Sequence, residues 1–214
     1  MTIEKSTFQF LKDLRKNNNR DWFADHKATY EKARLNAKDV FAEVLEKLEV
    51  HDEIEKSKMM RIYRDVRFSK DKTPYKAHFS NSYSRLGASL RGGYFLQIRP
   101  GESFLAGGFW EPSKEDLFRL RKEIEQDASE IRDVLSDKEF QKHFGDSFYS
   151  FSELKTAPRG FDKEHKDVDL LRKKGFIAMK KFSDKEVLDK AKLLIVVTVL
   201  GISISVNAKQ LSKT

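Results

Sequence analysis

Hydrophobic residues recur at helical spacing along three parts of the chain. Residues 6–16 begin with Ser6 and Gln9 at the spacing of a capping box, which predicts a short helix ending near Lys16. Residues 21–49 keep the helical period after the breaking sequence NNNR and predict a long helix. A third helix is predicted from Ser113, its N-cap, with a buried stripe that continues to Leu135.

Four other runs alternate between hydrophobic and polar residues, as strands do: residues 60–68, 94–100, 103–110 and 176–182. In the first run, alternation places Arg64 on an otherwise hydrophobic face with Met60, Ile62, Val66 and Phe68. The opposite face of that run would carry Arg61, Tyr63, Asp65 and Arg67. Pro100 and Gly101 mark the turn of a hairpin between the second and third runs.

Shorter elements are predicted in the remaining sequence. These are a helix over 137–144, a strand over 148–156, a helical turn over 168–174 and a last helix with a Ser183–Glu186 capping box. Residues 51–58 are polar and are expected to link two elements. Residues 77–93, rich in Ser and Gly, form either a mobile connection or a short strand and hairpin.

The C-terminal run LLIVVTVLGISISV, residues 193–206, is strongly hydrophobic. It has about 14 residues, whereas a membrane-spanning helix requires roughly 20. Its Val, Ile and Thr content favours a strand, while its continuity with the preceding helix favours a buried helix. The helix is the preferred interpretation, and no membrane partner is expected.

The order of the elements predicts an α+β fold, with an antiparallel or mixed sheet and helices packed mainly on one face. Helices and strands do not alternate as they do in βαβ units. No repeat, low-complexity tract or linker divides the chain. Residues 1–214 are therefore expected to form a single domain.

Composition favours anionic partners. Lys and Arg number 42 against 34 Asp and Glu, a formal net charge of +8. This excess favours nucleic acid or phosphorylated molecules, although 36% charged residues also make a soluble surface. Cysteine is absent, which removes disulfides, thiolate zinc sites and cysteine nucleophiles. The N-terminus lacks the apolar region of a secretory signal, so a cytoplasmic location is expected.

The densest group of cations lies in residues 60–76, MRIYRDVRFSKDKTPYK. The candidate ligand-binding residues there are Arg61, Arg64, Arg67, Lys70, Lys72 and Lys76. Arginine binds phosphate and carboxylate in two-point contacts, and lysine adds a point charge. Asp65 and Asp71 are the only acids in the stretch, and they are either acid/base candidates or ion-pair partners.

Alternation gives Arg64 and Arg67 different expected roles. The guanidinium of Arg64 is expected to be enclosed and within reach of a carboxylate, backbone carbonyls or a bound anion. Replacing Arg64 by Met is expected to cost on the order of 3–5 kcal/mol if the partner is a buried acid. Arg67 is expected to be more exposed and to serve ligand affinity rather than stability.

Two further features are weaker candidates. Arg159, between Pro158 and Gly160, is suited to present its side chain from a rigid turn and joins the ligand-binding candidates, although an ordinary surface turn has the same pattern. Gly101 and Gly107-Gly108 either expose backbone N–H groups to an anion or form a bulge. The five histidines lack metal-ligand spacing, so no metal and no cofactor are expected.

Several motifs together resemble the bacterial and fungal family known as domain of unknown function 2461, from about Phe8 to Asp189. They are NNNRDWFADHKATYEKAR, RIYRDVRFSKDKTPYK, GGFW-x-P, LKTAPRGF and DLLRKKGF. The resemblance implies a single globular domain of unassigned activity, without established catalytic residues. The family's recurrent polar positions correspond here to Asn18, Arg20, Trp22, Arg64, Asp65, Arg67, Lys70, Lys72, Thr73, Tyr75, Lys76, Arg159 and Gly160.

Three functional hypotheses follow for the basic stretch. The preferred one is binding of a phosphorylated or other anionic small molecule, with or without a reaction on it, and requires cations that converge in a pocket. Nucleic-acid binding requires cations spread over an open face. A structural or partner-binding domain requires cations that are paired in a buried ion network. The sequence does not indicate an oligomeric state.

Overall fold

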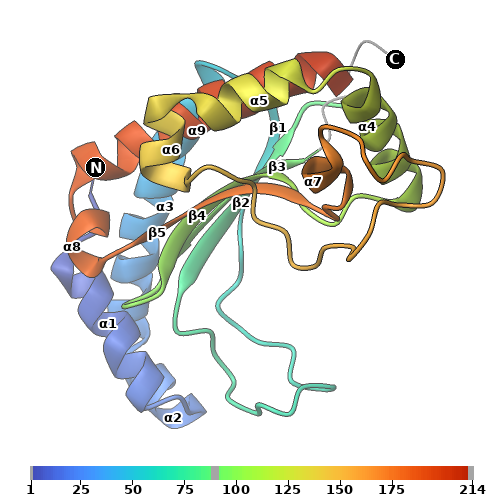
Figure 1. Ribbon diagram of the computed structural model, residues 1–214. Helices are drawn as coiled ribbons and strands as arrows, with labels where there is room; N and C mark the ends of the chain where they lie inside the picture. The colour runs from blue at the N-terminus through green and yellow to red at the C-terminus, as the bar shows by residue number, and fades with distance from the viewer. Residues whose placement is uncertain (1, 88–91, 212–214) are drawn as a thin grey trace.

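The computed structural model describes residues 2–87 and 92–211 and contains a curved five-stranded antiparallel sheet backed by helices (Figure 1). The strands follow one another across the sheet in chain order. They are β1 (Ile54–Met59), β2 (Phe79–Arg85), β3 (Gly93–Ile98), β4 (Ser103–Phe109) and β5 (Phe176–Phe182). The helices are α1 (Lys5–Lys16), α2 (Arg20–Asp25), α3 (Lys27–Glu49), α4 (Lys114–Gln126), α5 (Ser129–Ser136), α6 (Lys138–Phe144), α7 (Val168–Leu171), α8 (Asp184–Val187) and α9 (Lys190–Leu211).

The helices cover mainly one face of the sheet, as the α+β prediction required. Helix α3 packs on β1 and β2, α9 packs on β4, and α6 and α8 pack on β5. Strand residues that point toward these helices, such as Tyr83, Leu96 and Leu105, are fully buried. Residues of the opposite face, such as Phe95 and Phe104, are only partly buried. The sheet therefore has a helix-covered face and an open face.

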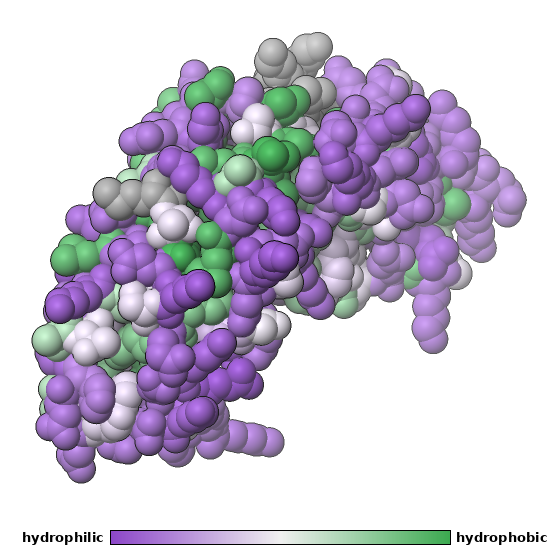
Figure 2. All heavy atoms as spheres, turned by 90° about the vertical axis from the view of Figure 1, so that its left-hand side faces the viewer, coloured by the Kyte–Doolittle hydropathy of each residue, from purple (hydrophilic) through white to green (hydrophobic). Residues whose placement is uncertain are grey.

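The outer surface of the helical layer is largely hydrophilic, with small scattered apolar areas (Figure 2). The same view shows that the molecule is arched, with a recess under the arch at the lower right. Within the part of the chain that the structure describes, no helix combines the length and the apolar character that crossing a membrane needs.

Gly107 and Gly108 in β4 allow close packing and do not form the bulge suggested from the sequence, because the pairing with β3 and β5 continues through them without a register shift. A Cβ atom at Gly107 would lie 2.9 Å from the side chains of Leu200 in α9 and of Tyr94. Gly108 has a φ of 128°, and a Cβ there would collide with the carbonyl oxygen of Phe176. These glycines bring α9 and β5 against β4 and are not arranged as an anion-binding turn.

Three helix predictions need correction. Helix α1 begins at Lys5 with Glu4 as its N-cap, and Ser6 Oγ donates to the Glu4 carboxylate instead of capping the helix. The long helix over 21–49 is broken at His26, which ends α2 and precedes α3. The helix from Ser113 stops at Gln126, because the Asp127 carboxylate accepts the N–H of Ser129 and starts a separate helix, α5.

The predicted strand over 60–68 is also wrong. The edge strand β1 lies earlier, in the polar stretch that was expected to be a link, and its Lys56 and Lys58 are exposed. Charged residues are common on edge strands because they prevent pairing with other chains. A last hydrogen bond to the sheet joins Met60 N to Ser80 O at 2.9 Å. Beyond it the chain leaves the sheet and has no neighbouring strand to continue the pairing.

The other strands were predicted within a few residues, except at two places. Residues 77–93 were predicted to be either a mobile connection or a short strand and hairpin, and they contain strand β2. Residues 88–91 of this segment lie outside the described residues. Residues 148–156 form only isolated bridges, Tyr149 with Ile177 and Glu153 with Lys173, so the strand predicted there is wrong. The C-terminal hydrophobic run is part of helix α9, as preferred. The Ser183–Glu186 capping box, however, starts the separate short helix α8 and not this last helix.

Candidate functional site

The basic loop, defined here as residues 60–78, is anchored to the N-terminal helices. Asn18 Nδ2 donates to Tyr75 O at 2.9 Å, and Tyr75 N donates to Asn18 Oδ1 at 3.1 Å. The ring of Phe23 in α2 stacks on Tyr75 with 4.0 Å between the ring centroids. The motif that precedes α2 and the basic motif are therefore one structural unit, at the lower end of the molecule in Figure 1.

The loop also pairs with itself. Arg64 N donates to Pro74 O at 2.9 Å, and Lys76 N donates to Ile62 O at 2.8 Å. These bonds make a short two-stranded ribbon around the Tyr63–Tyr75 bridge. The ribbon fixes the backbone positions from which the side chains of Arg64 and Lys76 extend.

Arg64 has an acceptor within reach, as expected, but the acceptor is not buried. Its Nη1 pairs with Asp71 Oδ2 and donates to Thr73 Oγ1 at 2.8 Å. Hydrogen bonds from the backbone and side chain of Thr73, with a smaller contribution from Arg64, lower the pKa of Asp71 to about 2. The Arg64 side chain is 29% exposed and that of Asp71 is 52% exposed. The stability cost expected for breaking a buried pair therefore does not apply to Arg64.

Arg67 is exposed, as expected, and pairs with Asp65. Its Nη2 lies 2.6 Å from Asp65 Oδ2 and its Nε lies 3.0 Å from Oδ1. The side-chain hydrogen bond from Arg67 is the main cause that lowers the pKa of Asp65. Carboxylates with lowered pKa values are weak proton acceptors at neutral pH, so the geometry does not favour Asp65 or Asp71 as a general base.

Phe68 differs most from the expected strand face. It was placed with Arg64 on a buried face, yet it is 95% exposed. The two-residue alternation holds only where a strand continues, and the ribbon has ended before Phe68. The guanidinium of Arg67 lies 5.9 Å from the centroid of its ring.

Arg61, Arg64 and Lys76 form the centre of a group of cations, named here the cation cluster. Lys76 is partly buried, and its pKa is lowered first by burial and then by the charges of Arg61 and Arg64. Among the described residues, no ion pair or hydrogen bond engages the side chain of Arg61 or of Lys76. Within the described ranges, Asp71 is thus the one carboxylate that forms an ion pair with any of these three cations.

His78 and Arg99 extend the cation cluster onto the sheet. They come just before β2 and just after β3, next to the directly paired residues Phe79 and Ile98. Burial, followed by the charges of Arg99, Lys76 and Arg64, lowers the pKa of His78 to about 4. The sequence analysis missed both residues, although His78 continues the alternation of Ser80, Ser82 and Ser84 in β2.

The remaining predicted ligand-binding residues do not join the cluster. Lys72 Nζ donates to Val66 O at 2.9 Å, and Lys70 is exposed. Arg159 is exposed on a turn whose Phe161 contacts the ring of Phe118 in α4. Helix α4 lies far from α2 and the basic loop in Figure 1, so the structure does not bring Arg159 to the loop.

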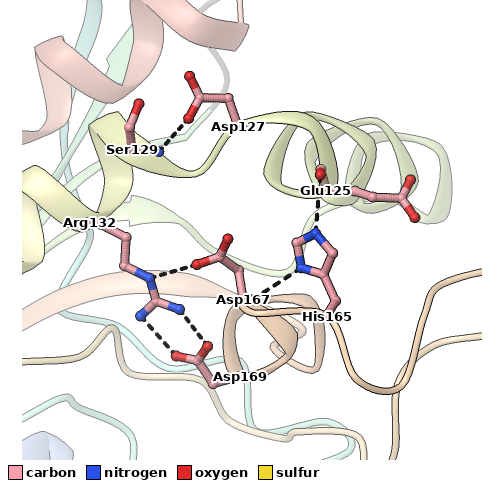
Figure 3. Close-up of polar contacts among 7 residues, drawn as sticks. All are labelled: Glu125, Asp127, Ser129, Arg132, His165, Asp167 and Asp169. Carbon is pink, nitrogen blue, oxygen red and sulfur yellow. Dashed lines mark hydrogen bonds and ion pairs between the residues drawn. The ribbon is translucent and has the colours of Figure 1, made fainter.

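A second polar cluster ties α7 and the segment before it to α4 and α5 (Figure 3). Arg132 Nη2 lies 2.5 Å from Asp169 Oδ1, and Arg132 Nε lies 2.9 Å from Asp167 Oδ1. His165 Nδ1 accepts the backbone N–H of Asp167, so its Nε2 carries the proton and donates to Glu125 O at 3.2 Å. This neutral histidine and the paired carboxylates are consistent with a structural role.

A third polar group lies inside the helix-covered side of the sheet. Arg85 Nε lies 2.6 Å from Asp52 Oδ2, and both side chains are only 3% exposed. Tyr94 donates its hydroxyl to Asp52 Oδ2 at 2.6 Å, and burial raises the pKa of Tyr94. Nothing local in the sequence relates these residues, because Asp52 and Tyr94 are 42 positions apart.

Within the described residues, no three His, Asp or Glu side chains are gathered as a metal site would require. No curated protein and no solved structure matches the chain. Residues 6–201 match the family described as Conserved hypothetical protein (DUF2461). This match covers most of the chain, including the basic loop and its anchor at Asn18. The chain therefore belongs to the domain of unknown function 2461 family.

Proposed function

We propose that the protein binds a phosphorylated or otherwise anionic small molecule at the cation cluster. The observation that carries this proposal is the crowding of Arg61 and Arg64 around Lys76, where, in the part of the chain that the structure describes, only Arg64 is ion-paired, with Asp71. Neighbouring positive charges repel one another, and a bound anion relieves that repulsion while accepting hydrogen bonds from the arginines.

The electrostatics of Lys76 and His78 support the proposal. Both pKa values are lowered, chiefly by burial and then by neighbouring cations. Groups perturbed in this way by several like charges are enriched at functional sites. The arginines and Lys76 supply positive charge, while neutral His78 adds a hydrogen-bonding group whose protonation responds to a bound anion.

The exposure of the ion pairs argues against a purely structural basic motif. The Arg64–Asp71 and Arg67–Asp65 pairs are both open to solvent. Exposed pairs contribute little to stability. A buried ion network is present elsewhere, in the Asp52–Arg85–Tyr94 group, which lies outside the basic loop.

A second candidate function, binding of single-stranded nucleic acid, is favoured by Phe68. This ring is almost completely exposed, and Arg67, Lys70 and Lys72 surround it in the sequence with exposed positive charge. Exposed aromatic rings flanked by cations stack on bases while the cations contact phosphates.

The test is a calorimetric titration with inorganic phosphate of the parent protein and of three single variants. Lys76→Gln and Arg61→Gln each remove an unpaired charge of the cluster and are expected to weaken binding about tenfold. Lys70→Gln is the matched control, because Lys70 is an exposed lysine of the same loop that does not belong to the cluster. Phosphate binding that is equally weakened by Lys70→Gln would contradict a localised site.

Binding of a single-stranded oligonucleotide, measured at increasing salt concentration, distinguishes the nucleic-acid candidate from the anion site. Spread phosphate contacts predict steep salt dependence and sensitivity to Phe68→Ala and Lys70→Gln. A localised anion site predicts that these two variants bind phosphate like the parent protein.

A further inference from the structure

The open face of the sheet contains a hollow that is separate from the cation cluster. It has a volume of about 520 Å³, and its floor is formed by the side chains of Ser82, Phe95, Phe104, Ala106 and Ile177. Trp110, at the end of β4, also lines it. This volume lies within the range of small-molecule sites, roughly 300–1,000 Å³.

Aromatic rings dominate the hollow and its rim. The rings of Phe95 and Phe104 lie side by side on the floor, with 5.7 Å between their centroids. At the rim, Trp110 meets Phe151 edge-to-face at 4.4 Å, and both side chains are about half exposed. Partly exposed rings around a small hollow offer stacking and edge contacts to a planar ring system.

Strand register places unpaired lysines on both sides of this aromatic floor. Lys58 in β1 lies opposite Ser82, which in turn lies opposite Phe95. Lys181 in β5 lies directly opposite Phe104. Both lysines are exposed, and neither ammonium group has an ion-pair partner among the described residues. Positive charge therefore lies on both sides of the aromatic floor.

The same floor leads toward the cation cluster. Arg99 follows Phe95 by four residues and lies just past the end of β3, which corresponds to about 13 Å in an extended chain. A ring over Phe95 and a charged group near Arg99 and His78 are thus about one nucleotide length apart. The positive charges of Lys58 and Lys181 beside the floor, and of Arg99 at its end, favour an anion. The aromatic rings of the floor favour a ligand with an aromatic group.

We infer that the hollow holds the aromatic ring of a small anion with the dimensions of a nucleotide, whose charged group reaches toward Arg99 and the cation cluster. This inference rests on the proposed function and names the chemical class of its ligand. We favour a small molecule over a polymer because the hollow has room for one ring system. The lysines on both of its flanks favour a ligand that is an anion.

Trp110 provides a direct reporter, since the chain has only one other tryptophan, Trp22. The experiment titrates ADP, adenosine and pyrophosphate into the parent protein, Trp22→Phe and Trp110→Phe. ADP is expected to change the fluorescence of the parent and of Trp22→Phe, but not of Trp110→Phe. It is also expected to bind roughly tenfold to hundredfold more tightly than pyrophosphate, because ring stacking adds to the contacts of the charged group.

Lys181→Gln is expected to weaken ADP binding several-fold, whereas Lys163→Gln, at an exposed lysine of the segment before α7, serves as the matched control. ADP that binds no more tightly than pyrophosphate, without a change at Trp110, overturns the inference and leaves the proposed function intact. Absence of binding by both ADP and pyrophosphate overturns the proposed function and the inference together. A single-stranded oligoadenylate that binds more tightly than ADP, with a change at Trp110, overturns the assignment of a small molecule.

Discussion

Two of the Arg–Asp pairs in this protein have the same chemistry in opposite surroundings. Arg85 and Asp52 meet between the sheet and the helices, where each side chain is only 3% exposed. Arg64 and Asp71 meet on the basic loop, where solvent reaches both. The buried pair has a third member, because the Tyr94 hydroxyl donates to Asp52. The loop pair instead has two cations as neighbours, Arg61 and Lys76, that form no ion pair in the part of the chain the structure describes.

This difference shows that burial and neighbours decide what an arginine does. A buried guanidinium and carboxylate have lost their water and depend on each other, so removing one leaves an uncompensated charge. An exposed pair keeps its water and is screened, so each member remains available to another ion. We therefore expect the buried pair to serve stability, and we propose that the loop pair serves binding.

The largest expected effect is at the buried pair. Arg85→Met leaves the Asp52 carboxylate without its cation and is expected to lower the free energy of unfolding by about 3–5 kcal/mol. Urea denaturation followed by circular dichroism measures this change. Tyr94→Phe removes one hydrogen bond from the same carboxylate and is expected to cost less, about 1–3 kcal/mol. An Arg85→Met variant as stable as the parent would remove the distinction between the two pairs.

A much smaller effect is expected at the loop pair. Arg64→Met should unfold at nearly the same urea concentration as the parent protein, because its partner is exposed. The pKa of Asp71 should rise from about 2 but stay below its ordinary value, since the hydrogen bonds from Thr73 remain. A lowered carboxyl pKa contributes stability that is lost as pH falls through it, so the variant should lose this contribution at a higher pH. Carboxyl NMR titration checks the shift, and an unchanged Asp71 pKa would mean that Arg64 does not hold it.

Much of the fold could be predicted from local patterns, because most helices and strands β3, β4 and β5 carry their own periodicity. The prediction failed at residues 60–68, where alternation is present but no neighbouring strand is available beyond Met60. It also failed at β1, whose exposed edge position allows polar residues on both faces. Strand formation there depends on a partner elsewhere in the chain, which a local pattern does not contain.

The candidate site was predicted in part for the same reason. The cations of the loop are neighbours in sequence, and the pairing of Arg64 with Asp71 spans only seven positions. His78 and Arg99 come together only through the register of β2 and β3, and Lys58 and Lys181 flank the hollow only through the order of five strands. Arg159 is the opposite case: its local Pro-Arg-Gly turn predicted a binding residue, but the fold places that turn far from the cation cluster.

The most direct test of the proposed anion site is the pKa of His78, measured by NMR titration with and without phosphate. In the free protein this pKa is lowered from 6.5 to about 4 by burial and by the charges of Arg99, Lys76 and Arg64. A bound anion offsets those charges and favours the protonated ring, so phosphate should raise the His78 pKa and bind with proton uptake between pH 4 and 6.5. Lys76→Gln should raise the pKa in the absence of phosphate and reduce the further rise on its addition. A His78 pKa that stays the same at saturating phosphate would contradict the placement of the anion at the cation cluster.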